Sequence, residues 1–130
     1  MKLNQNTNHT KIIIRTKINP TESLEKIRTS IKNITNKNPT TETKKTLEIS
    51  GDINLLNVIK NRINKEGYNE VAEGILNKNK KDNMTFFYIN KQSAYNNKFH
   101  ISDVDLSTLG DIKVELYDEN MDDLIDYIVN

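Results

Sequence analysis

The stretch Met84–Asn90, MTFFYIN, constrains the fold of this chain more than any other part of the sequence. Its aromatic and β-branched residues favour an extended strand. Successive side chains of a strand point to opposite faces. Both faces are apolar here, with Met84, Phe86 and Tyr88 on one and Phe87 and Ile89 on the other. Because a strand with two apolar faces is typical of the middle of a sheet, we expect this strand to be central.

The segment that follows is polar and breaks the alternation. Residues 91–94 carry no strand pattern, and Asn96-Asn97 is a turn signal. We therefore expect a tight polar corner and then a return strand. Asn90 and Gln92 have two interpretations here, as contacts to a ligand or RNA or as hydrogen-bond partners of the turn backbone. The second is favoured, because such side chains often bond the backbone of turns.

Three further strands follow from period-two alternation, at residues 11–18, 45–50 and 112–117. In the first, Ile12 and Ile14 face one side, and Lys11, Ile13, Arg15 and Lys17 face the other. The first strand therefore has an apolar face for the core and a basic outer face.

Four helices follow from apolar residues at helical spacing. Asn19-Pro20-Thr21-Glu22 is expected to start the first, because Asn19 can cap it and Glu22 can complete a capping box. The others are expected near residues 52–66, 68–77 and 121–129. The third should bury Val71, Ala72, Ile75 and Leu76.

This order predicts an α+β fold, a two-layer sandwich in which helices cover one face of a mostly antiparallel sheet. We expect a flexible N-terminus at residues 1–10 and a single domain at 11–130. The uncovered face should carry the basic residues of the first strand, aromatic residues of the central strand, and Tyr117. This open face is the main functional expectation from the pattern.

Composition excludes several kinds of chemistry. The chain has no cysteine, only four glycines and no glycine-rich phosphate motif. Asp103 and Asp105 could bind a hard cation or form a solvated acidic loop, and the loop is favoured. The expectation is a protein without metal or cofactor that is not an enzyme. No apolar run is long enough to cross a membrane and the polar start lacks a signal-peptide core, so a cytoplasmic location is expected.

Charge is unevenly distributed. Residues 103–130 contain nine acidic residues and one lysine, a net charge of −8; since the chain carries +1, residues 1–102 carry +9. The basic part could be a working surface for an anionic partner, or the acidic tail could pack on it and cancel it.

Three segments resemble an archaeal group, uncharacterised protein family 0201. They are Asn19–Glu22, Phe87–Ala94 (FYINKQSA) and Leu109–Leu116 (LGDIKVEL), and they occur in the family's order. The resemblance implies a fold like that of the ribosomal protein that binds 5S RNA, and a loosely described role as an RNA-binding or exosome-associated protein.

These observations favour a non-catalytic RNA-binding module that holds phosphates with basic side chains and bases with aromatic ones. The candidate RNA contacts are Lys11, Arg15, Lys17, Lys78, Lys80, Lys81, Asn90, Lys91, Gln92 and Lys98. The alternative is a homodimeric interaction or scaffold domain that uses the same face. Its candidate interface residues are Ile13, Phe86, Tyr88 and Tyr117.

Overall fold

The computed structural model describes residues 9–130. Most of the segment expected to be flexible, residues 1–10, lies outside this range. Thr10 is buried, and its hydroxyl donates a hydrogen bond to the Asp118 carboxylate. The ordered fold therefore includes the residue that precedes the first strand.

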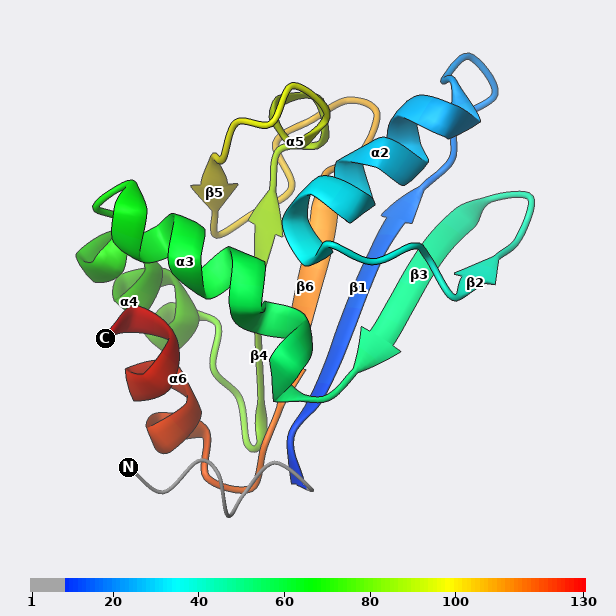
Figure 1. Cartoon of the computed structure of the whole chain (residues 1–130). Helices are drawn as coiled ribbons and strands as arrows, with labels where there is room; N and C mark the ends of the chain where they lie inside the picture. Colours follow the sequence, from blue (N-terminus) through cyan, green and yellow to red (C-terminus); the bar gives the residue numbers. More distant parts are fainter. Residues whose placement is uncertain (1–8) are drawn as a thin grey trace.

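Within residues 9–130, six strands form one sheet in which every neighbouring pair is antiparallel (Figure 1). The strands are β1 (Lys11–Lys17), β2 (Thr41–Glu42), β3 (Thr46–Gly51), β4 (Met84–Ile89), β5 (Ile101–Ser102) and β6 (Ile112–Tyr117). Their order across the sheet is β2-β3-β1-β6-β4-β5. The two edge strands, β2 and β5, have only two residues each.

The expectation that the aromatic strand is central was wrong. β1 and β6 occupy the middle of the sheet, and β4 has only the short β5 beyond it. Phe87 and Ile89 are buried in the core, but Phe86 and Tyr88 are half-buried on the opposite face. The second apolar face of β4 therefore belongs to a partly exposed surface and not to a second core layer.

The helical elements are α2 (Leu24–Thr35), the 3-10 helix η2 (Ile53–Leu56), α3 (Asn57–Lys65), α4 (Asn69–Lys78), α5 (Lys91–Tyr95) and α6 (Met121–Val129). Figure 1 shows α2, α3 and α6 on the same side of the sheet. Their buried isoleucines and leucines meet Ile12, Ile14 and Ile49 of the strands in one hydrophobic core. The predicted two-layer α+β fold is confirmed.

The first helix begins later than expected. Ser23, not Asn19, caps α2 and accepts a hydrogen bond from the Lys26 backbone N–H (3.4 Å). Asn19–Glu22 instead forms a turn, in which the Glu22 N–H donates to the Asn19 carbonyl (2.9 Å) and the Glu22 carboxylate accepts from the Asn19 N–H (3.1 Å). The capping-box pairing is therefore present, but it holds the turn that precedes the helix.

One residue of α4 faces outward against expectation. Ala72 and Leu76 are buried one turn apart, whereas Val71 is 52% exposed. The buried side of this short helix follows the i, i+4 spacing of Ala72 and Leu76. Val71 lies beside that buried side and faces solvent.

The polar corner after β4 is a helix, α5, that Asn90 caps. The Asn90 side chain accepts a hydrogen bond from the Ser93 backbone N–H (2.8 Å), as was predicted for this residue. Gln92 is exposed, and its side chain makes no hydrogen bond to any residue of the described chain. The expectation that Gln92 satisfies the turn backbone was therefore wrong.

This difference gives a prediction with a built-in control. Asn90→Ala should lower the free energy of unfolding by about 1 kcal/mol, the usual effect of losing an N-cap. Gln92→Ala should leave it within about 0.5 kcal/mol, as for other exposed positions. Urea denaturation of both variants measures the two effects. A loss of less than about 0.5 kcal/mol in Asn90→Ala would show that the Asn90 cap does not stabilise the corner.

Candidate functional site

The side of the sheet that faces away from the helices is the candidate site. We call it the open face and define it by the outward residues Glu48, Ser50, Lys11, Ile13, Arg15, Lys17, Lys113, Glu115, Tyr117, Met84, Phe86 and Tyr88. Among these, only Glu115 is buried. Strand register sets them in rows, one of which runs Glu48, Arg15, Lys113, Tyr88 across β3, β1, β6 and β4.

A compact charged group occupies the middle of the open face. The Glu115 carboxylate accepts hydrogen bonds from Arg15 (3.0 Å) and the Tyr117 hydroxyl (3.2 Å), and Lys113 lies 3.3 Å from it. Arg15 also lies 3.6 Å from Glu48. Burial and the neighbouring Glu115 charge raise the pKa of Tyr117 above its ordinary value. The positive charges of Arg15 and Lys113 are therefore largely balanced by carboxylates.

Aromatic rings lie beside this group. The rings of Phe86 and Tyr88 meet edge to face, with centroids 5.9 Å apart. The Lys113 ammonium lies 4.6 Å from the centre of the Phe86 ring, a cation–π contact. Two partly exposed rings and a cation thus form a surface on which a flat, electron-rich group could stack.

The predicted basic contacts separate into different places. Lys11 and Lys17 are exposed at the two ends of β1, and neither has an acidic partner within residues 9–130. Lys78 is paired with Asp103, and Lys80 is paired with Asp122 at 2.7 Å. Lys81 and Lys98 are exposed away from β1, in the connections before β4 and after α5. The sequence predicted the basic outer face of β1, but the predicted RNA contacts do not form a single cluster in the structure.

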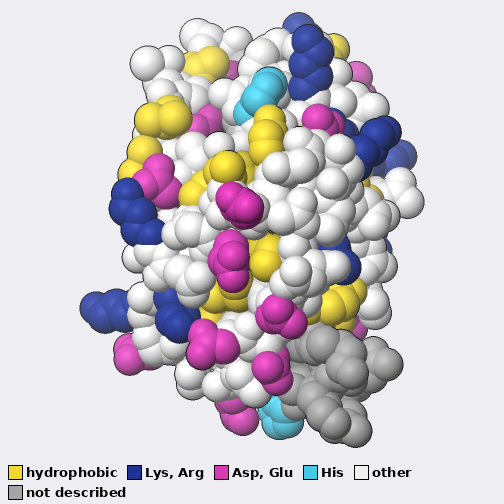
Figure 2. Space-filling view, turned by 90° about the vertical axis from the view of Figure 1, so that its left-hand side faces the viewer, with side chains coloured by type: hydrophobic (Ala, Val, Ile, Leu, Met, Phe, Trp, Pro, Cys, Tyr) yellow, Lys and Arg dark blue, Asp and Glu magenta, His cyan; other side chains and the backbone are white. Residues whose placement is uncertain are grey.

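The acidic tail balances part of the basic segment. Arg15–Glu115, Lys78–Asp103 and Lys80–Asp122 each join a residue before position 102 to one after it. These pairs favour the interpretation in which the tail packs on the basic part. Figure 2 shows the side of the molecule that bears β5, where hydrophobic patches alternate with acidic side chains.

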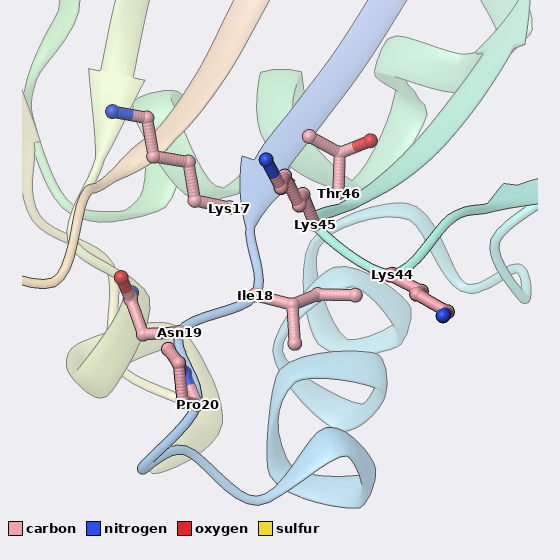
Figure 3. Close-up of a pocket in the computed structure, with 7 residues that line it drawn as sticks. All are labelled: Lys17, Ile18, Asn19, Pro20, Lys44, Lys45 and Thr46. Carbon is pink, nitrogen blue, oxygen red and sulfur yellow. The ribbon is translucent and has the colours of Figure 1, made fainter.

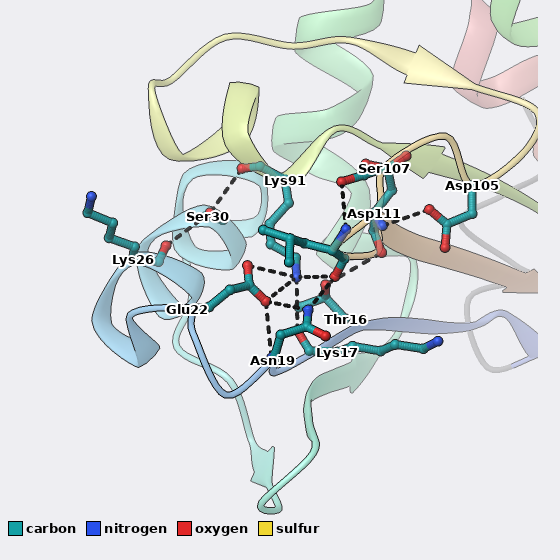
Figure 4. Close-up of polar contacts among 11 residues, drawn as sticks. Thr16, Lys17, Asn19, Glu22, Lys26, Ser30, Lys91, Asp105, Ser107 and Asp111 are labelled. Carbon is teal, nitrogen blue, oxygen red and sulfur yellow. Dashed lines mark hydrogen bonds and ion pairs between the residues drawn. The ribbon is translucent and has the colours of Figure 1, made fainter.

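Lys91 was predicted to contact RNA, and this was wrong. Its side chain is 7% exposed and its ammonium donates to both Glu22 oxygens (3.0 and 3.2 Å) and to the carbonyls of Lys17 (2.9 Å) and Leu109 (3.1 Å), as Figure 4 shows. All its hydrogen-bonding capacity is used inside the protein, so a bound phosphate could not reach it.

The three segments that carry the family resemblance meet at this buried lysine. Asn19 donates through its side-chain amide to Glu22 (2.7 Å) and to the Leu109 carbonyl (2.6 Å), and Ser30 donates to the Lys91 carbonyl (3.1 Å). Burial raises the pKa of Glu22, but hydrogen bonds from Asn19 and Lys91 together lower it below the ordinary glutamate value. The observed role of these segments is to join β1, α5 and the loop before β6.

Two adjoining hollows lie at the Lys17 end of β1. The larger, about 690 Å³, is lined by Lys17, Ile18, Asn19, Pro20, Lys44, Lys45 and Thr46 (Figure 3). The smaller, about 300 Å³, includes Arg15, Tyr88 and Lys113 of the open face and shares Lys17 and Thr46 with the larger. Sequence reasoning missed Lys44 and Lys45, because Lys45 was expected only to begin a strand and Lys44 only to precede it.

The acidic residues considered for a cation have other partners. Asp103 is paired with Lys78, and Asp105 accepts a hydrogen bond from the Asp111 backbone N–H (2.9 Å). No group of three or more potential metal ligands occurs in the described part of the chain. The exposed His100 forms a hydrogen bond with the Ser93 hydroxyl (2.8 Å).

Comparison with known proteins gives concordant results. A family model described as RNA binding matches residues 11–116. A UPF0201 protein of Methanothermobacter thermautotrophicus is 37% identical over 61% of this chain and 60% of its own length, and one of Methanocaldococcus jannaschii is 33% identical over 85% and 66%. The chain thus spans less than two thirds of either relative. A crystal structure of an uncharacterised UPF0201 protein superimposes with a TM-score of 0.78 at 25% identity, over 92% of both chains.

No described helix of the chain is both long and apolar enough to cross a membrane.

Proposed function

We propose a function for this chain from its family: it belongs to the RNA-binding family whose model matches residues 11–116. The resemblance to uncharacterised protein family 0201 is confirmed by its archaeal relatives. The family is described by what it binds and not by a reaction that it catalyses. The proposed role is a non-catalytic RNA-binding module of the archaeal cytoplasm, which binds RNA with the open face.

The pairing of Phe86 and Tyr88 on the open face is the observation that carries this proposal. Their rings are half-buried, in mutual contact and next to Lys113. Unpaired RNA bases stack on such rings, whereas a helical RNA offers mainly its backbone. The open face therefore suits an RNA that presents unpaired bases, such as a hairpin loop.

Phosphate contacts should come from the unpaired lysines at the ends of β1. Arg15 was predicted to hold a phosphate, but carboxylates on two sides balance its charge. Lys11 and Lys17 are exposed and lack such partners in the part of the chain that the structure describes. We therefore assign the main phosphate attraction to these two lysines. The Arg15–Glu115 pair instead holds Lys113 and Tyr117 in position.

The test is a titration of a hairpin RNA, followed by fluorescence anisotropy at several salt concentrations. Lys11→Ala combined with Lys17→Ala should weaken binding and reduce the log–log salt slope by about 1.4, since each single-strand phosphate contact contributes roughly 0.7. The matched control is Lys32→Ala with Lys65→Ala, which removes two exposed lysines from α2 and α3.

The control variant should bind as the wild type does, with only the small change expected from net charge. If wild-type protein shows no salt-dependent binding to any structured RNA, the proposed function fails. If both double variants lose affinity and slope equally, binding responds to net charge and not to the open face.

A further inference from the structure

We propose that the larger hollow beside Lys17 seats one unpaired nucleotide of the RNA, with its base on the floor and its phosphate on the lysines. This inference rests on the proposed function and adds a second subsite to it. The hollow lies past the end of β1, outside the aromatic pair of the open face.

The floor of the hollow is suited to a base or ribose. Ile18 is half-buried and packs on the core, and Pro20 is exposed, so the hollow presents apolar surface to solvent. The Ile18 N–H donates to the Lys45 carbonyl (2.7 Å), which fixes the two sides of the hollow relative to each other. Its volume of about 690 Å³ lies within the range of small-molecule sites in proteins.

The rim of the hollow carries three lysines and no carboxylate. These lysines, Lys17, Lys44 and Lys45, are exposed. Within residues 9–130 none of the three has an ion-pair partner, unlike Arg15 and Lys113 nearby. Figure 3 shows Lys17 and Lys45 on either side of the end of β1, with Lys44 extending away from both. Such a rim attracts a phosphodiester backbone and not a cation.

The hollow is continuous with the open face. Lys17 and Thr46 line both hollows, and the smaller one reaches Tyr88 on β4. Only β6 separates β1 from β4, so the two sites lie about two strand spacings, roughly 10 Å, apart. One RNA strand whose base stacks on Tyr88 can therefore continue past Lys17 into the larger hollow.

The test compares two RNA probes: a blunt-ended hairpin, and the same hairpin with a short single-stranded extension. Wild-type protein should bind the extended hairpin about fivefold more tightly, because the added nucleotide brings one phosphate to the lysine rim and one base to the apolar floor. Lys44→Ala with Lys45→Ala should remove this preference and leave the affinity for the blunt hairpin within about twofold, because neither lysine is on the open face. The matched control, Lys32→Ala with Lys65→Ala, should keep the preference.

The outcomes separate the two proposals. Equal affinity of the wild type for both hairpins, or a preference that survives in Lys44→Ala/Lys45→Ala, would overturn the nucleotide subsite and leave RNA binding by the open face intact. No binding of either hairpin would overturn the proposed function and the subsite together.

Discussion

Lys91→Met should lower the free energy of unfolding by about 3–5 kcal/mol, the usual effect of removing one partner of a buried ion pair. Methionine fills a similar volume but brings no charge. The Glu22 carboxylate, 11% exposed, would be left without its counter-charge. The carbonyls of Lys17 and Leu109 would also lose their donor. Chemical denaturation measures the loss.

Lys98→Met is the matched control, because Lys98 is exposed and forms no ion pair within the described residues. It should change stability by no more than about 0.5 kcal/mol. Glu22→Gln combined with Lys91→Met should be more stable than Lys91→Met alone, since neither buried charge is then left without a partner. A Lys91→Met variant that loses less than about 1 kcal/mol would mean that water reaches Glu22 easily.

The pH dependence of stability offers a second readout of the same contact. Because the pKa of Glu22 is lower in the folded protein than in the unfolded chain, its ionisation stabilises the fold at neutral pH. This contribution is complete above the unfolded pKa, about 4.3, and is lost as the pH falls through the folded pKa. The Glu22→Gln variant should therefore lose less stability than the wild type between neutral and acidic pH.

Phe86→Ala combined with Tyr88→Ala should weaken binding of a hairpin RNA by about 10- to 100-fold, as expected for the loss of one or two stacked bases. The salt slope should stay unchanged, because no phosphate contact is removed. This separates the aromatic variant from Lys11→Ala/Lys17→Ala, for which slope and affinity fall together. Anisotropy titrations with the same RNA measure both quantities.

Tyr95→Ala is a suitable control for the aromatic variant. Tyr95 belongs to α5 and is not part of the open face. The Lys26 ammonium lies 5.2 Å from the centre of the Tyr95 ring. Its removal should leave RNA binding unchanged. Circular dichroism should show that each variant retains the folded secondary structure.

The homodimer interface predicted at Ile13, Phe86, Tyr88 and Tyr117 competes for the same surface. All four residues are half-buried on the open face, and their role in an interface stays a prediction. Analytical sedimentation of the wild type and of Phe86→Ala/Tyr88→Ala distinguishes the two functions. A wild-type dimer that becomes a monomer in the variant, with RNA affinity unchanged, would assign the face to self-association.

Local periodicity was sufficient to predict the layers of this fold. The alternation in β1 placed Ile12 and Ile14 in the core and Arg15 on the open face, and the structure confirms both. The alternation of apolar and polar side chains depends only on neighbours in sequence, so it can be recognised without knowing the order of the strands in the sheet. The position of β4 was not predictable in this way, because half-buried aromatic residues and core residues have the same apolar character.

The features that were missed depend on contacts between distant segments. Lys91 lies in a polar stretch, and nothing nearby in sequence indicates that it meets Glu22, which lies 69 positions earlier in the chain. Lys44 and Lys45 gain their place beside Lys17 only because β3 pairs with β1. Residue types identified the candidate cations, and tertiary pairing decided which of them are free to bind a phosphate.

The two-residue edge strands β2 and β5 limit how this sheet could polymerise. An exposed strand edge offers unpaired backbone groups to another chain, and long flat edges lead to intermolecular sheets and amyloid. Here β2 and β5 each offer only two residues in strand conformation, and the Asn79 side chain donates to the Phe86 carbonyl of β4 (2.9 Å). Growth of an intermolecular sheet from either side is therefore disfavoured, even though the polypeptide is rich in β-forming isoleucine.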